Sequence, residues 1–125
     1  MTAPKLRQLV WVGSSLKELR AFPEEVRQVM GFALYQAQTG DKHVAAKPLR
    51  GFGGAGVLEV VEDHAGDTYR AVYTVRFAEA VYVLHAFQKK ATRGIATPKH
   101  EIDLISSRLA AARRLHEQRS GSKGA

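Results

Sequence analysis

The order of apolar and polar residues divides the chain into seven predicted elements. Runs of β-branched and aromatic residues are typical of strands, and apolar residues three and four positions apart are typical of helices. The predicted strands cover residues 7–12, 57–62, 68–77 and 80–87. The predicted helices cover residues 16–20, residues 23–38, and a last segment that Thr97 caps and Pro98 opens.

The three later strands follow one another so closely that the chain must turn back on itself. Their connections, around Ala65–Asp67 and Ala78–Glu79, are short enough for hairpins. An antiparallel sheet with helices packed against it buries the apolar faces in one core, which predicts the α+β fold class. Alternation along residues 68–77 predicts a core face and an exposed face. The core face would hold Tyr69, Ala71, Tyr73, Val75 and Phe77, and the exposed face Arg70, Val72, Thr74 and Arg76.

The last helix and the end of the chain differ in composition. A chain of 125 residues fits one domain, which we place at residues 1–118. Residues 119–125 are polar and rich in Gly and Ser, so we expect a disordered tail. The buried stripe of the last helix is expected to consist of Ile102, Ile105, Leu109 and Ala112, with Arg108, Arg113 and Arg114 in solvent.

Charge and composition narrow the class of protein. The formal net charge of +7 and the pI near 10 favour a nucleic acid or an acidic protein as partner. The absence of cysteine excludes disulfides and suits the cytoplasm. The five scattered histidines have no metal-binding spacing, and no segment approaches the roughly 20 apolar residues of a membrane span. We therefore expect a soluble cytoplasmic protein that binds neither metal nor membrane.

Most candidate chemistry lies in cationic side chains near the predicted sheet. Arg70 lies in the middle strand, Lys89 and Lys90 follow the last strand, and the glycine-rich loop 41–56 carries Lys47 and Arg50. Such groups can grip RNA phosphates and stabilise the charge that develops when a ribose 2′-hydroxyl attacks its phosphate. Equally, Arg70 can form an ion pair with Glu59 or Glu62 across the sheet, and the lysines can be plain solvated charges.

Three residues are candidates for proton transfer near neutral pH. His85 lies in an apolar strand, where alternation with Val81, Val83 and Phe87 favours a hydrogen-bonded core residue. His100, in the first turn of the last helix, is a candidate acid or base or a polar surface residue. Glu59 is a candidate base or a partner that orients Arg70.

Five short segments, in this order, resemble the phage-derived HigB-like toxins of the RelE/ParE superfamily. The resemblance extends from about residue 9 to 115. The segments are Lys-Pro-Leu-Arg-Gly at 47–51, Val-Leu-Glu-Val at 57–60, Tyr-Arg-Ala-Val-Tyr at 69–73, Leu-His-Ala-Phe-Gln-Lys-Lys at 84–90, and Ile-Ala-Thr-Pro-Lys at 95–99 followed by Glu101 and Ile102.

This resemblance implies a RelE-like fold, a small curved antiparallel sheet flanked by helices. It also implies the toxin of a type II toxin–antitoxin system, a ribosome-dependent mRNA endoribonuclease that uses no metal or cofactor. The partners would be a helix-turn-helix antitoxin, the ribosome and mRNA, with DNA reached only through the antitoxin. Arg70 matches the catalytic arginine of RelE-type toxins, and Lys89 and Lys90 match their basic pair.

The chain departs from RelE at other catalytic positions. Val57 and Glu59 stand where RelE carries two lysines, and the last helix shows no counterpart of its catalytic tyrosine. Glu59 and His100 are the proposed substitutes. The expected RNA-binding residues are Lys47, Arg50, Arg76, Arg93 and Lys99. A ParE-like gyrase inhibitor that does no chemistry, and an inactive relative that only binds its partner, remain alternatives.

Overall fold

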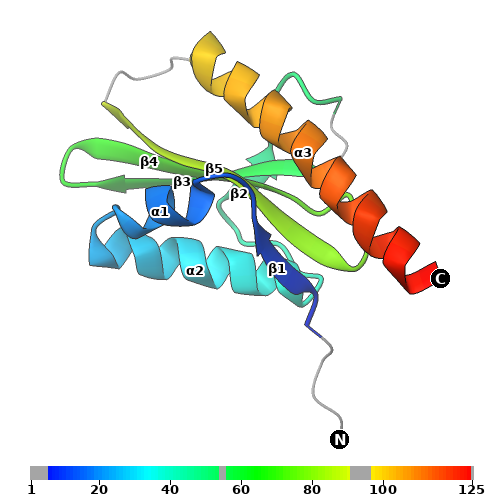
Figure 1. Cartoon of the computed structure of the whole chain (residues 1–125). Helices are drawn as coiled ribbons and strands as arrows, with labels where there is room; N and C mark the ends of the chain where they lie inside the picture. Colours follow the sequence, from blue (N-terminus) through cyan, green and yellow to red (C-terminus); the bar gives the residue numbers. More distant parts are fainter. Residues whose placement is uncertain (1–5, 54–55, 91–96, 125) are drawn as a thin grey trace, which may run out of the picture.

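A five-stranded sheet lies between two layers of helix (Figure 1). The structure is a computed structural model that describes residues 6–53, 56–90 and 97–124. The elements are β1 (Gln8–Trp11), α1 (Ser15–Arg20), α2 (Glu24–Gln38), β2 (Ala46–Pro48), β3 (Val57–His64), β4 (Asp67–Thr74), β5 (Ala80–Lys90) and α3 (Lys99–Gly124). The α+β fold class is confirmed. Among the described residues, none of the helices combines the length and apolar character that a membrane span requires.

The sheet has the strand order β1-β5-β4-β3-β2. Strands β3, β4 and β5 form the expected antiparallel meander, and the turn between β3 and β4 places Ala65 and Gly66 at φ angles of 51° and 86°. Two left-handed residues are the requirement of a two-residue hairpin that matches the twist of its strands. Strand β1, however, pairs with β5 in parallel, so the expectation of a purely antiparallel sheet is wrong. The long connection between them allows the parallel pairing.

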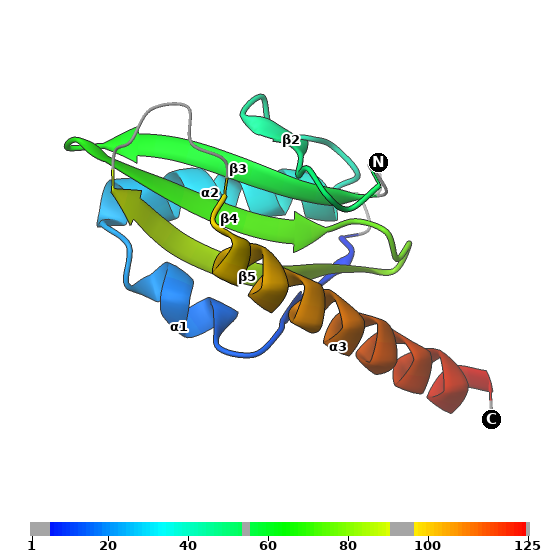
Figure 2. The same cartoon turned by 90° about the horizontal axis from the view of Figure 1, so that it is seen from above.

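Both faces of the sheet are covered, in contrast to the expected exposed face on β4. On one side α1 and α2 pack on Tyr69, Ala71 and Tyr73. On the other side lies α3 (Figure 2), and its Ile105, Leu109 and Ala112, as expected, pack on the face that includes Val72. Val72 and Thr74 are therefore fully buried. Only a tertiary contact with α3 could bury them, since strand alternation alone cannot tell which face a later helix will cover.

Two local features differ from the sequence prediction near the ends of strands. The predicted loop 41–56 contains the short strand β2, which pairs with β3 at the edge of the sheet. Pro48 is tolerated there because an edge strand does not need every N–H for the ladder. Strand β4 ends at Thr74, whose Oγ1 accepts a hydrogen bond from the N–H of Arg76. Phe77 consequently lies in the α3 cluster, against Tyr82, instead of sharing the face of Tyr73.

A bulge in β5 changes the face on which His85 lies. The register pairs Tyr73 with Val83 but Val72 with His85, so Leu84 is an extra residue. Val81 and Val83 consequently contact the α1 and α2 layer, whereas His85 pairs with Val72, which lies on the α3 side. The buried, hydrogen-bonded state expected for His85 is found, but its expected face is not.

Helix α3 corrects two further expectations. It continues to Gly124, so residues 119–124 are helical where the composition predicted disorder. Extending an existing helix adds one hydrogen bond for each residue ordered, which reduces the effect of weak helix formers at its end. Arg108, expected in solvent, has only 12% of its side chain exposed because it pairs with Glu18 of α1.

Candidate functional site

Arg70 is the centre of a charged cluster on the α3 side of the sheet. Its Nη1 donates a hydrogen bond to Oε2 of Glu59 at 3.0 Å, and Lys47 Nζ lies 3.8 Å from the other carboxylate oxygen. Glu59 is 7% exposed, Arg70 is 15% exposed and Lys47 is mostly exposed. The ion pair anticipated as one interpretation of Arg70 is therefore present. It holds the guanidinium in place rather than removing it from solvent entirely.

Lys89 belongs to the same cluster. Arg70 pairs with Phe87 across β4 and β5, and Lys89 is two residues further along β5, on the same face. Desolvation lowers the pKa of Lys89 below its ordinary value, the positive charge of Arg70 lowers it further, and Glu59 opposes this change. We call Lys47, Glu59, Arg70 and Lys89 the cationic face.

The other residues expected to bind RNA are placed around or beyond this cluster. Arg50 and Arg76 are exposed, and they follow β2 and β4 in the chain. Both therefore lie toward the end of the sheet opposite to Thr68, the residue that pairs with Lys89. Lys99 and His100 are exposed in the first turn of α3. The side chain of Lys90 and the whole of Arg93 lie outside the described residues.

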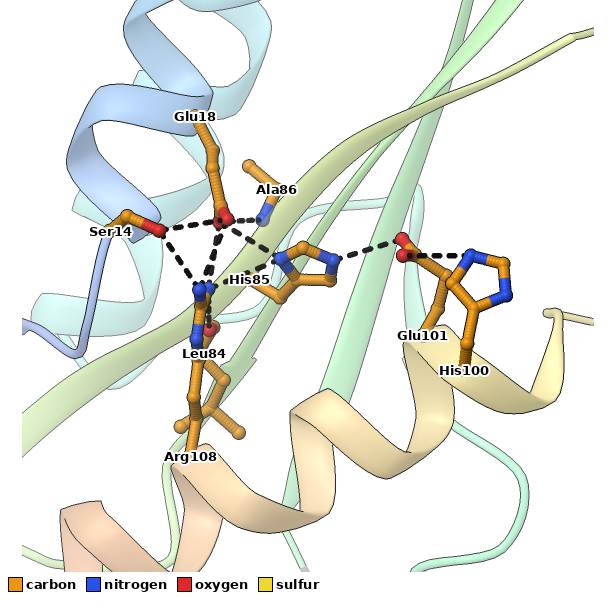
Figure 3. A network of polar contacts seen from close by, with 8 residues as sticks. All are labelled: Ser14, Glu18, Leu84, His85, Ala86, His100, Glu101 and Arg108. Carbon is orange, nitrogen blue, oxygen red and sulfur yellow. Dashed lines mark hydrogen bonds and ion pairs between the residues drawn. The ribbon is translucent and has the colours of Figure 1, made fainter.

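A polar network on β5 joins three elements near the cationic face (Figure 3). Strand β1 pairs with residues 80–83 of β5. Further along β5, beyond the end of β1, Glu18 of α1 accepts a hydrogen bond from the N–H of Ala86. Arg108 donates to both oxygens of Glu18, at 2.8 and 3.1 Å. His85 lies between two carboxylates, with Nδ1 2.9 Å from Glu18 and Nε2 2.9 Å from Glu101.

The sequence prediction missed the role of Glu18, Glu101 and Arg108 in this network. For the two residues of α3 a signal existed. Glu101 and Arg108 are four residues before and three after Ile105, which places both on the helix's apolar stripe. A charged residue in register with a buried stripe indicates a buried partner. Glu18 carried no comparable signal, since it lies in a helix of six residues.

The network strongly perturbs Glu18. Burial alone would raise the pKa of Glu18, but hydrogen bonds from Arg108, His85 and the backbone, together with the charge of His85, lower it to about 2. A carboxylate whose pKa is lower in the folded than in the unfolded chain stabilises the fold above its unfolded value of 4.5. That stabilisation is lost as the pH falls toward 2.

We expect acid unfolding to reveal this contribution. On the scale of 1.4 kcal/mol per pKa unit, discounted for the partial exposure of Glu18, wild type should lose about 1–2 kcal/mol of Glu18-dependent stability between pH 4.5 and 2. The measurement is chemical denaturation at a series of pH values for wild type and Glu18→Gln. The two curves should converge as the pH falls. Glu117→Gln, an exposed change on α3, should stay parallel to wild type; convergence there as well would contradict the assignment to Glu18.

Among the described residues, no three His, Asp or Glu side chains gather in an arrangement that could hold a metal ion. The face carries cations held by a carboxylate, with an imidazole and a second carboxylate beside them. Such a set can bind an anion and can accept a proton.

Residues 17–110 match the family described as "Phage derived protein Gp49-like (DUF891)". The chain belongs to this family. The Gp49-like chain also has the fold of RelE toxins. The isolated E. coli RelE toxin matches with a TM-score of 0.54 and 24% identity over 70% of this chain and 88% of RelE. A double mutant of E. coli RelE in the free state matches with a TM-score of 0.54 and 21% identity over 85% of this chain and 97% of RelE.

Among curated proteins, none matches the sequence of this Gp49-like chain. The RelE-like fold expected from the sequence is confirmed. The narrower HigB-like assignment remains a prediction.

Proposed function

We propose that this Gp49-like chain is the toxin of a type II toxin–antitoxin system and cleaves mRNA on the ribosome. The observation that carries the proposal is the cationic face. Arg70 is held at 3.0 Å by the buried Glu59, with Lys47 and Lys89 beside it, on the sheet of a RelE-like fold. The resemblance of the sequence to HigB-like toxins supports the same function.

The reaction proposed is a transesterification within the message. The 2′-oxygen of a ribose attacks the adjacent phosphorus, the bond from phosphorus to the 5′-oxygen breaks, and the products are a 2′,3′-cyclic phosphate and a 5′-hydroxyl. Arg70 stabilises the extra negative charge on the phosphoryl oxygens. Lys89, with its lowered pKa, is suited to protonate the departing 5′-oxygen. Lys90 remains a candidate for phosphate binding.

Glu59 is assigned to positioning rather than to proton transfer. Both of its oxygens already face cations, at 3.0 Å from Arg70 and 3.8 Å from Lys47, and the side chain is 7% exposed. A base must reach the proton that it removes, within a hydrogen bond of a substrate hydroxyl. Glu59 instead fixes the guanidinium so that the ribosome can present the phosphate to a group already oriented.

The proposed partner rests on the resemblance and on the charge distribution. The resemblance implies an antitoxin of the helix-turn-helix type, and the net charge of +7 favours one that presents acidic residues to the cationic face. Bound in this way, the antitoxin would exclude the message. The proposed setting is the cytoplasm, where ribosomes and messages are found.

The test is induction of the wild-type chain alone in bacteria, with mapping of new 5′ ends on two reporter messages. One message is translated, and the other differs only in lacking its start codon. Cuts inside the reading frame of the translated message alone are the expected result. Growth arrest with relaxed plasmid DNA and no cuts would favour the gyrase alternative. Normal growth with no cuts would favour a relative that only binds its partner.

A further inference from the structure

His85 lies between two carboxylates in a way that suits both of its protonation states. A protonated ring can donate from Nδ1 to Glu18 and from Nε2 to Glu101, each at 2.9 Å. A neutral ring that keeps its proton on Nε2 still donates to Glu101, and Nδ1 can then accept from Arg108 Nη1 at 3.2 Å. In both states the Nε2–H donates to Glu101. The carboxylate of Glu101 is therefore held in one orientation.

This carboxylate lies beside the cationic face. His85 pairs with Val72, and Phe87 pairs with Arg70. His85 and Arg70 are therefore diagonal neighbours in the sheet, and the Cα atoms of such a pair lie about 7–8 Å apart. The rings of His85 and Phe87 are stacked with centroids 4.9 Å apart. Glu101 contacts His85 at Nε2, on the side of the ring opposite to Glu18. This contact brings a second carboxylate to the sheet face that carries Arg70.

Glu101 differs from Glu59 in the partners of its two oxygens and in its exposure. Its Oε2 faces His85, while Oε1 lies 3.3 Å from Nε2 of His100, whose ring is 79% exposed. The carboxylate is 16% exposed, about twice the exposure of Glu59. Glu101 is thus held by a buried group through Oε2, while its Oε1 faces a ring that is exposed to solvent, the side from which a substrate hydroxyl can approach a proton acceptor.

We propose that Glu101 accepts the proton of the attacking 2′-hydroxyl and that His85 is its positioning residue. This inference rests on the proposed nuclease function and deepens it. The proton moves from the 2′-oxygen to Oε1 of Glu101 as the bond from that oxygen to phosphorus forms. The bond to the 5′-oxygen breaks, and Lys89 supplies the proton that the leaving oxygen takes.

The charged groups around this acceptor set its pH dependence. Glu18 from α1 and Arg108 from α3 face the His85 ring, and His100 faces Glu101. Replacing His85 by glutamine keeps an N–H donor for Glu101 but removes the ring that can itself gain and lose a proton. The shape of the rate profile should then change, an effect that a merely structural role would not produce.

The experiment measures single-turnover cleavage of a defined message on purified, programmed ribosomes between pH 5 and 8.5. Glu101→Gln keeps an acceptor for His85 but is not a base, so its rate should fall at least 100-fold. Glu101→Asp should keep part of the activity. Asp103→Asn makes the corresponding acid-to-amide change at an exposed site on the same helix and should match wild type. Thermal melts of each variant identify any loss of folding.

The outcomes separate this inference from the proposed function. Cleavage by wild type with a Glu101→Gln rate within threefold of it would overturn the role of Glu101 and leave the nuclease intact. If wild type itself does not cut programmed messages, both ideas fail. Should Glu101→Gln melt at a much lower temperature, the pH profiles of Glu101→Asp and His85→Gln decide. Profiles identical in shape to that of wild type would overturn the proposal.

Discussion

Replacing Arg70 with alanine should lower the rate of message cleavage by about 100- to 1,000-fold, the usual cost of losing one group that stabilises a developing negative charge. Arg70 is the cation that the buried Glu59 holds most closely, at 3.0 Å, so its guanidinium is already oriented before RNA arrives. A preorganised charge pays no cost of reorganisation during the reaction. The measurement is the single-turnover rate on programmed ribosomes.

This variant needs a control for folding, because it removes the cation that lies closest to the buried Glu59 and leaves Lys47 at 3.8 Å. A buried carboxylate that loses its closest partner destabilises the fold. Arg70→Lys keeps the positive charge but loses the guanidinium geometry, and we expect about a tenfold loss of rate. Arg27→Ala removes an exposed arginine from α2, in the layer on the other side of the sheet, and should cleave like wild type. Full toxicity of a folded Arg70→Ala chain would contradict the proposed role of Arg70.

Replacing Arg108 with methionine should lower the free energy of unfolding by about 3 kcal/mol. Arg108 bridges α3 to α1 through Glu18, to β5 through the carbonyl of Leu84, and to Ser14. Removing one partner of a largely buried ion pair leaves the other charge uncompensated, which costs about 3–5 kcal/mol in buried pairs; the partial exposure of Glu18 places the expected cost at the lower end.

For a chain of this size the melting temperature should fall by about 10 °C. Arg113→Met makes the same chemical change at an exposed position on α3 and should melt within about 2 °C of wild type. The double variant Glu18→Met with Arg108→Met removes both charges, so its loss should be smaller than the sum of the two single losses. A single Arg108→Met variant as stable as wild type would show that the network contributes no net stability.

These two predictions separate the cationic face from the network beside it. Arg70 is expected to affect the rate far more than the stability, whereas Arg108 is expected to affect the stability directly. Glu101 belongs to both parts, since it accepts from the buried His85 with one oxygen and faces the exposed His100 with the other. Its variants therefore require both measurements.

Local sequence patterns determined most of the elements, because they depend on near neighbours. The period of 3.6 predicted α2 and the buried stripe of α3, and alternation with short turns predicted the meander of β3, β4 and β5. An ion pair of Arg70 with Glu59 or Glu62 was likewise accessible to the sequence, since all three lie in predicted neighbouring strands, and the structure has the pair with Glu59. The order of these elements predicted the α+β class, and the resemblance of the motifs implied the RelE-like fold.

Only the tertiary structure decided the contacts between residues distant in the chain. The parallel pairing of β1 with β5 and the edge strand β2 depend on how the sheet assembles. The bulge at Leu84 moved His85 to the face of α3, and no period along the strand encodes such an extra residue. The contact of Glu18 with Arg108 spans 90 positions in sequence. Burial of a charged residue is stable only when folding places an oppositely charged or hydrogen-bonding partner next to it. The sequence of its own segment therefore does not determine its burial.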